Sequence, residues 1–350
     1  MDLVLNGAAS GDVATRLMQH NFDPRALRPW IGKNGQSYIA TGGPGPDGKL
    51  VNNALVTNAP ATLRKDEWIQ LDQAVLKAAK PRLRVVGDMR GAGLNYSIPN
   101  GMGKTTLEHE AQSDIGPASI SMDGLREGDT ERPVFDLRNL PLPIIHKDFS
   151  FSARQIATSR NGGSPLDTTT AELAGRRVAE EVEKLTIGEN DTYQFGGGTI
   201  YGFKNFPDRL TQAITAPGTP ENTVNEVLQM RQQSTDNGYY GPWMLYYSSA
   251  FAVSMDEDYS AAKGDNTLRD RLKRIEGIVD VRQADYLTGN TLLLVQQTSE
   301  VARIVTGMDI TTVQWESHGG MQMNFKVMAI MVPQLRADFY GNTGIVHGSV

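Results

Sequence analysis

A glycine-rich turn is the first of four groups of residues whose types and spacing could support chemistry. Gly101-Met-Gly-Lys-Thr-Thr106 resembles the end of a phosphate-binding loop, in which backbone amides cradle phosphates while a Lys and a Thr complete the site. That motif requires a glycine five residues before Gly103, where Ile98 stands, and no helical pattern follows the turn. The sequence therefore favours a polar loop tip over a nucleotide site.

The histidines form the second group. They lie far apart and lack the HxxxH or HExxH spacing with which one helix face holds a metal ion. The five are His20, His109, His146, His318 and His347. Each fits a packing or surface position better than a ligand position, so we expect no metal site.

Hydroxyl and carboxylate clusters form the remaining groups. Thr158-Ser-Arg160 and Ser248-Ser249 lie outside any nucleophile-elbow pattern, and a base for either would have to come from tertiary structure. Asp256-Glu-Asp258 lacks the alternating ligands and central glycine of a calcium loop, and it fits a solvated helix end. We therefore expect no catalytic, cofactor-binding or metal residues and no enzyme activity. The alternative from another class is a hydrolase or nucleotide-binding enzyme built on Lys104 or these hydroxyls.

The amino-acid composition excludes further classes of protein. The 350 residues carry 34 Lys and Arg against 40 Asp and Glu, a net charge of -6, which excludes the strongly basic balance of proteins that neutralise nucleic-acid phosphates. The chain has no cysteine, so stability must come from packing, pairing or assembly. Its 36 glycines and 17 prolines indicate many turns and extended segments. The first 17 residues have neither a basic n-region nor a long apolar stretch, so we expect cytoplasmic synthesis and no membrane partner.

The N-terminal part is predicted to be an arm that lies on another protein chain. Within residues 1 to about 80, the run Thr41-Gly-Gly-Pro-Gly-Pro-Asp-Gly48 should fix neither a helix nor a central strand. Apolar residues at helical spacing predict a helix over 65–79 that ends at Pro81.

Alternation broken by glycine follows, over 82–138. Apolar and polar residues alternate over 118–123, which predicts a strand with one wet face. The polar segment 95–114 lies between strand-like ends and is interpreted as a long two-stranded excursion. A two-stranded ribbon is marginal alone, so we expect support from outside its own hairpin.

The clearest element is a helix of about 20 residues that ends at Gly188. It begins with the capping-box pattern Thr169-Thr-Ala-Glu172, and its apolar face comprises Ala171, Ala174, Val178, Val182 and Leu185. The opposite face is interpreted as solvated, with three opposite-charge pairs four residues apart: Glu172/Arg176, Arg177/Glu181 and Glu180/Lys184.

Short helices and strands alternate after this helix. Helices are predicted around Val224–Leu228 and Leu268–Ile275. Strands are predicted at 243–247, 278–281, 292–295 and 321–332, the last alternating at first and then wholly apolar, as in a strand buried on both faces.

The order of these segments resembles the encapsulin and phage major capsid group, over roughly 141–336. The segments that carry the resemblance are Ile144–Gln155, Gly162-Gly163, Leu173–Glu181, Thr199–Phe203, Asn237–Tyr246, Arg271–Val281 and Phe325–Pro333. The resemblance implies an α+β chain with the Hong Kong 97 capsid fold, in its encapsulin-like branch.

That fold implies a division of the chain into named parts. They are an N-terminal arm at 1–80, an extended β-hairpin E-loop at 81–139, a peripheral domain at 140–218 with a spine helix at 168–187, an axial domain at 219–318, and a peripheral return strand with the C-terminus at 319–350.

The resemblance also implies the function of a tailed-phage major capsid protein. Copies would self-assemble as hexamers and pentamers into the icosahedral virion shell around double-stranded DNA, with decoration, scaffolding and portal proteins as further partners. The long segment before the E-loop favours this viral branch, and the acidic balance suits a wall that contacts DNA weakly and non-specifically. The alternative is an encapsulin-type nanocompartment shell that encloses a cargo enzyme.

Overall fold

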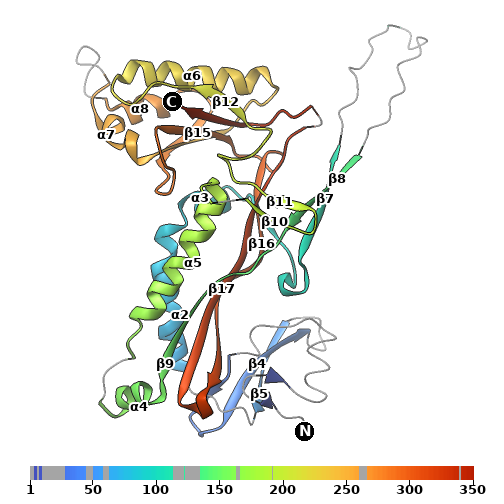
Figure 1. Ribbon diagram of the computed structural model, residues 1–350, viewed down its shortest axis with the longest axis vertical. Coiled ribbons are helices and arrows are strands. Elements are labelled where there is room, and N and C mark those ends of the chain that lie inside the picture. The colour runs from blue at the N-terminus through green and yellow to red at the C-terminus, as the bar shows by residue number, and fades with distance from the viewer. Residues whose placement is uncertain are drawn as a thin grey trace.

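Figure 1 shows an elongated molecule, with a helix-covered sheet at one end and long strands running toward the other. The computed structural model describes residues 4–5, 8–9, 28–44, 50–57, 63–112, 122, 135–162, 166–190, 192–259, 266–338 and 340–350. Helices and strands are both prominent within this part, which confirms the predicted α+β class.

The long central sheet has the strand order β6-β16-β17-β9. Its strands are β6 (Asn95–Ser97), β16 (Ala302–Ser317), β17 (Gln322–Leu335) and β9 (Ile145–Ser152). β17 pairs antiparallel with both β16 and β9, and β6 lies parallel to β16. Along β17, alternate residues are buried as far as Val327, and every residue is buried from there to Leu335. This confirms the predicted strand with a half-wet beginning and a fully buried end.

Two helices lie side by side along this sheet (Figure 1). They are α2 (Lys65–Ala79) and α5 (Thr169–Ile187), and both confirm predicted helices. Leu71 of α2 and Val178 of α5 are buried in the main hydrophobic cluster. A Cβ at Gly175 would lie 2.8 Å from Cγ1 of Val75, so glycine permits the close approach of the two helices.

The start and the charged face of α5 differ from prediction. The expected capping box is absent, because the N-cap is Thr168, one residue before the predicted Thr169, and its side chain makes no cap hydrogen bond. The Thr168 hydroxyl instead donates to Glu172 Oε1 at 3.2 Å. The charged face is not solvated throughout, since Glu180 and Glu183 are only 4% and 1% exposed. Arg176 and Arg177 both contact Glu180, and none of the three predicted pairs is among the ion pairs of this described helix. α3 (Arg84–Gly91) and the 3₁₀ turn Lys80–Arg82 pack against this end of α5, which explains the burial.

A second, five-stranded sheet forms the other end of the molecule, in the order β12-β18-β15-β13-β14. Its strands are β12 (Leu210–Ala213), β13 (Trp243–Tyr247), β14 (Ile278–Gln283), β15 (Thr291–Gln296) and β18 (Ile345–Ser349). Three helices accompany it, α6 (Pro220–Asp236), α7 (Ala252–Asp256) and α8 (Leu268–Lys273). The predicted helices and the strands β13, β14 and β15 are confirmed, whereas β16 and β18 were not predicted. A division of the chain at 219–318 separates β12 and β18 from the sheet that they complete.

The N-terminal segment contains more regular structure than predicted. The strands β3 (Trp30–Ile31), β4 (Ser37–Pro44) and β5 (Leu50–Thr57) form a sheet, and β1 (Val4–Leu5) pairs with β2 (Ala8–Ala9). The segment Thr41–Gly48 was expected to fix neither a helix nor a central strand, but its first four residues continue β4, the middle strand of this sheet, and pair with β5. Pro44 is tolerated because it ends the strand. The arm also includes α2, whose Trp68 belongs to the main core, because helical apolar spacing buries that face against the sheet.

Residues 82–112 differ most from prediction. The first of them form α3, because Val85, Val86 and Met89 are buried at helical spacing. Residues 95–114 are not one hairpin, since β6 joins the central sheet. The ribbon instead pairs β7 (Thr106–Gln112) with β8 (Phe135–Pro141). The strand predicted at 118–123 lies outside the described residues, except for Met122, which is fully exposed in a bend.

Two smaller elements complete the fold. The helix α4 (Ala153–Gly162) follows β9, and a hairpin of β10 (Tyr193–Phe195) and β11 (Gly198–Ile200) lies against β8. Within the part of the chain that the structure describes, no helix is long and apolar enough to cross a membrane.

Candidate assembly site

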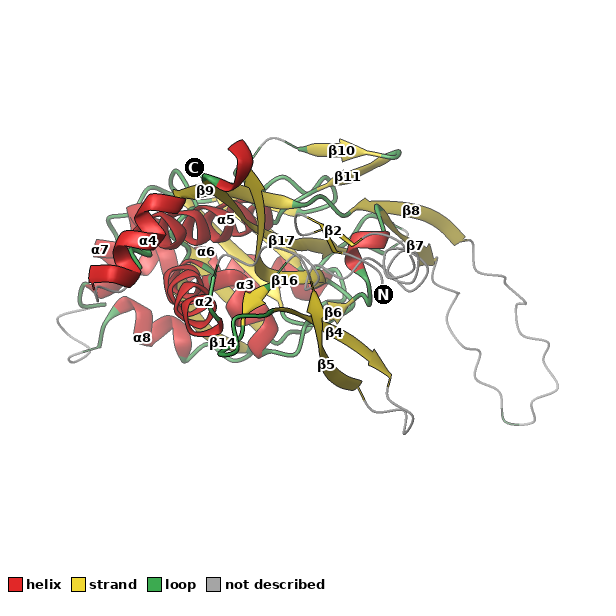
Figure 2. Ribbon diagram, turned by 90° about the horizontal axis from the view of Figure 1, so that it is seen from below, coloured by secondary structure: helices red, strands yellow, loops and turns green. Residues whose placement is uncertain are grey.

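The ribbon of β7 and β8 projects from the body of the molecule (Figures 1 and 2). In its register Phe135 lies opposite Gln112, and Leu137 lies opposite Glu110. Directly opposite residues share a face of a ribbon, so Leu137 and Glu110 place an apolar and a polar side chain on one face. Phe135 and Leu137 are 57% and 58% exposed. Large apolar side chains left in water on a projecting element are typical of a surface that contacts another protein.

The base of the ribbon is firmly attached to the body. Leu140 of β8 packs with Val305 of β16 and Ile330 of β17 in a small hydrophobic cluster. The hairpin β10–β11 lies so close that a Cβ on Gly198 would overlap the carbonyl oxygen of Asn139. Part of the support predicted for the ribbon therefore comes from its own chain, and its outer half remains available to a neighbour.

The hairpin beside the ribbon adds further exposed aromatic side chains. Tyr193 and Phe195 of β10 are 45% and 51% exposed. The ribbon and this hairpin together offer a candidate protein-contact surface, which we call the ribbon surface: Phe135, Leu137, Tyr193 and Phe195.

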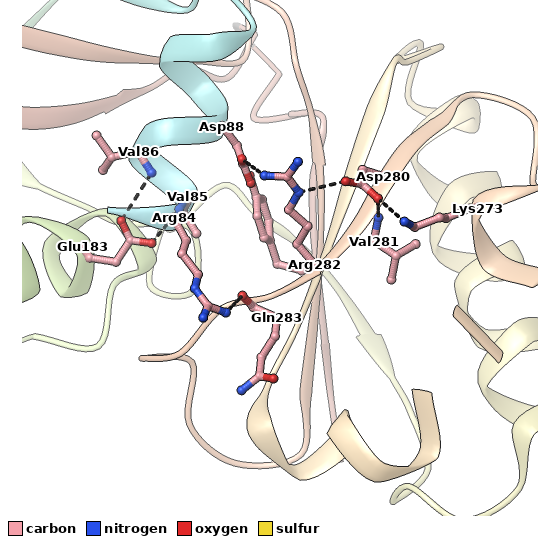
Figure 3. Close-up of polar contacts among 11 residues, drawn as sticks. Arg84, Val85, Val86, Asp88, Glu183, Lys273, Asp280, Val281, Arg282 and Gln283 are labelled. Atoms are coloured by element: carbon pink, nitrogen blue, oxygen red, sulfur yellow. Dashed lines mark hydrogen bonds and ion pairs between the residues drawn. The ribbon is translucent and has the colours of Figure 1, made fainter. Parts of the chain in front are cut away.

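A buried carboxylate fixes α3 to α5 (Figure 3). Glu183 of α5 accepts hydrogen bonds from the amide N–H groups of Val85 and Val86, at 2.6 and 3.3 Å. These amides belong to the first turn of α3 and have no partner within their helix. Burial raises the pKa of Glu183 to about 7, against the effect of the two amide bonds.

A second group of charges connects α3 to the five-stranded sheet (Figure 3). Asp88 of α3 accepts hydrogen bonds from Arg282 of β14 and from the hydroxyl of Tyr246 of β13. Burial raises the pKa of Asp88 more than Arg282 lowers it. Arg282 and Lys273 also bind Asp280, each at 2.8 Å; burial opposes ionisation there, but these hydrogen bonds prevail and lower the pKa of Asp280 to about 2. The arrangement fixes α3 to the five-stranded sheet.

The glycine-rich turn does not have the geometry of a phosphate loop. Gly101–Gly103 form one 3₁₀ turn, and Gly101 packs against the backbone of Gly307 with no room for a side chain. β7 follows Lys104 in place of the helix whose N-terminus a phosphate would need.

The histidines lie at separate places in the structure. Burial and nearby cationic side chains lower the pKa values of His109 and His347 to about 4. His146 lies 3.5 Å from Asp148, His318 occupies a turn after β16, and His20 falls outside the described residues. No group of three His, Asp or Glu side chains suited to a metal ion occurs in the described part of the chain.

The side chains of the hydroxyl and acidic clusters take part in packing and ion pairs within the fold. Thr158–Arg160 lie in α4, where Arg160 pairs with Glu67 of α2 at 2.7 Å. Ser248 is buried between β13 and a 3₁₀ turn. Asp256 ends α7 and pairs with Arg269 at 2.8 Å. The structure therefore brings none of the predicted groups together, and it assembles instead the ribbon surface and the Glu183 and Asp88 contacts. No sequence motif indicates those, because their partners come from distant segments.

Comparisons with known proteins agree on one architecture. The chain is 23% identical, over 287 residues, to the type 1 encapsulin shell protein EncA of Myxococcus xanthus, covering 80% of this chain and 92% of that protein. The virus-like particle from Pyrococcus furiosus superposes with a TM-score of 0.57 at 16% identity, covering 81% of this chain and 99% of that one. The capsid of Myoviridae phage XM1 gives 0.56 at 8% identity, with 76% and 92% covered.

These likenesses show that the chain has the Hong Kong 97 capsid fold in its encapsulin-like form, which confirms the resemblance inferred from segment order. A model of a family of unknown function, DUF6260, matches residues 58–348, from just before α2 into β18. The chain therefore belongs to the DUF6260 family.

Proposed function

We propose that this chain is the major capsid protein of a tailed bacteriophage, a structural protein whose copies form the icosahedral virion shell around double-stranded DNA. The fold carries the proposal, since the phage XM1 capsid matches 76% of this chain. The ribbon surface supports it, because it gives each copy exposed apolar side chains with which to contact another. In this role the copies form hexamers and pentamers, with scaffolding, decoration and portal proteins as further partners, after synthesis in the host cytoplasm.

The net charge of -6 supports weak and non-specific contact with packaged DNA. A shell that gripped its genome through many phosphate contacts would need a basic balance that this chain lacks. The domain limits stated above belong to the same proposal, with β12 and β18 added to the axial sheet.

A second candidate is an encapsulin-type compartment that encloses a cargo enzyme. The specific observation in its favour is the match to EncA, which extends over 92% of that protein.

Electron microscopy and sedimentation of the purified chain test the proposals together. Closed shells or their precursors are expected, and a stable monomer at every salt concentration and pH would contradict both candidates. Nuclease-treated particles from the native source then separate them. Protected double-stranded DNA supports the capsid, whereas a smaller shell that contains a second protein and no DNA supports the compartment.

A further inference from the structure

A cavity of about 370 Å³ lies between the base of the ribbon and the body. His109, Arg138 and Asn139 line it from the ribbon, and Gln334 lines it from the end of β17. The lining also includes one carboxylate, Asp208, which pairs with Arg138 at 3.7 Å. Of the ribbon surface, Leu137 alone belongs to the lining, and the contacts so far leave the polar side of the cavity without a role.

Several polar atoms at this cavity lack partners. Gln334 is only 1% exposed, and its Oε1 accepts a hydrogen bond from Arg303 Nε at 2.5 Å. Its Nε2 donor has no hydrogen-bond partner among the described residues, nor do Asn139 Oδ1 and His109 Nδ1. A buried donor without a partner costs about 1–3 kcal/mol, so a polar ligand in the cavity would remove a real penalty.

The surroundings of Gln334 are positively charged. Arg303 lies directly opposite Gln334 across the β16–β17 ladder, and Arg336 is two residues further along the chain. Opposite and alternate positions share one face of a sheet. In the described part of the chain neither Arg303 nor Arg336 forms an ion pair. Arg138, by contrast, pairs with Asp136 and Asp208.

The two unpaired guanidinium groups are fixed in place. Arg303 stacks over the ring of Tyr96, with its Cζ 4.2 Å from the ring centroid. Arg336 donates to the carbonyl oxygen of Ser299 at 3.4 Å, while its Nε has no partner among the described residues. Burial lowers the pKa of Arg303, and the nearby charge of Arg336 lowers it further.

We propose that this cavity is an oxyanion site, in which Gln334 Nε2 donates a hydrogen bond to a carboxylate or phosphate group and the charges of Arg303 and Arg336 attract it. Arg303 and Arg336 do not themselves line the cavity, so they favour either anion through their charge, while Gln334 supplies the direct hydrogen bond. The anion has two sources, a side-chain carboxylate from a second copy of this chain or free phosphate. The first source rests on the proposed shell, and the second does not.

Equilibrium dialysis with radiolabelled inorganic phosphate, on dissociated full-length subunits, tests the site. The wild type should show saturable binding at one site. Arg336→Gln and Gln334→Leu should each weaken it by about tenfold or more. Arg154→Gln, which removes an exposed arginine of α4, is the matched control and should bind as the wild type does.

Absence of saturable binding to the wild type, or unchanged binding by Arg336→Gln, would overturn the proposal. Arg336→Lys keeps the charge and removes only the fork of donors, so it should bind more tightly than Arg336→Gln. If the Arg336→Gln variant does not fold, phosphate binding to the wild type still tests the proposal, because absence of saturable binding would overturn it. Acetate should compete with labelled phosphate, and chloride at equal ionic strength should compete far less; equal competition would reduce the site to general charge screening and overturn the proposal.

The same measurement on assembled particles identifies the source of the anion. Phosphate that binds subunits but not particles indicates that a carboxylate of a second copy fills the cavity in the shell. Binding to both indicates free phosphate. A chain that binds phosphate yet never assembles would contradict the proposed function while leaving the oxyanion site in place.

Discussion

The aromatic cluster around Phe325 and the ribbon surface contain similar apolar side chains, but these are buried in the cluster and exposed on the ribbon surface. Phe325 is fully buried, with the rings of Phe149, Phe151 and Trp68 at centroid distances of 5.2 to 5.9 Å. Phe135 also lies on a strand, yet more than half of it faces water. The difference shows that the subunit gains its own stability along the central sheet, and that apolar area on the ribbon can stabilise only a contact with another chain.

The largest expected effect comes from removing the centre of the buried cluster. Phe325→Ala should lower the free energy of unfolding by about 3–5 kcal/mol, because it deletes a buried ring and leaves a cavity. Denaturant unfolding of dissociated subunits measures this. Phe135→Ala is the matched ribbon variant and should change the same quantity by about 0.5 kcal/mol or less. Similar losses of unfolding free energy in the two variants would show that the ribbon stabilises the subunit as much as the buried cluster does.

The converse experiment changes the ribbon and measures assembly. Leu137→Ser should raise the subunit concentration needed for assembly by about tenfold or more, because the leucine loses its apolar burial against a neighbour. Light scattering across a concentration series gives that threshold, and unfolding of the subunit should stay unchanged. Leu173→Ser, at a 53% exposed position on α5, should leave the threshold as it is. An unaffected threshold in the ribbon variant would show that this face is not an assembly contact.

A third prediction concerns the contact between α3 and α5. Because burial raises the pKa of Glu183 to about 7, its protonated form is favoured in the folded state. The resulting stabilisation is fully present below the unfolded-state pKa near 4.5 and is lost as the pH rises through about 7. Between pH 5 and 8, the unfolding free energy of the wild type minus that of Glu183→Gln should fall by about 2 kcal/mol.

Other titrating groups do not obscure this difference. Asp88 acts in the same direction as Glu183, while His109 and His347, with lowered pKa values, favour unfolding as the pH falls below their unfolded-state values. Both proteins contain all three groups, so subtraction removes the contributions of the two histidines. Besides burial, the charge of Asp88 raises the pKa of Glu183, so the difference reports Glu183 together with its coupling to Asp88. Equal pH slopes for the wild type and Glu183→Gln would show that Glu183 is ionised throughout.

The smallest effect is expected at an ion pair on α5 in which the arginine is exposed and the glutamate, Glu180, is buried. Arg177 is 68% exposed and lies 2.8 Å from Glu180, which Arg176 also binds. Arg177→Ala should lower the unfolding free energy by less than about 1 kcal/mol, because water screens the pair and Arg176 remains. Thermal unfolding of matched subunits measures the change. A loss as large as that of Phe325→Ala would mean that surface charge, not burial, dominates this subunit.

Periodicity predicted the elements whose burial follows one simple pattern. α2, α5 and β17 bury residues at regular steps, and their sequences show those steps directly. β16 was missed because Thr306–Thr312 combine polar residues with a glycine, while the pairing with β17 that stabilises them shifts register there. The burial of Glu183 could not be predicted either, since the amides that accommodate it belong to α3, about a hundred residues earlier in the chain.

The position of β18 has a consequence for the order of events during synthesis. β18 lies between β12 and β15, and these strands are separated from it in sequence by the whole of β16 and β17. A ribosome therefore delivers β12, β13, β14 and β15 well before the strand that joins β12 to the others. Translation can yield a finished central sheet while the five-stranded sheet still has an open edge at β15, so that sheet is expected to close last on each nascent chain.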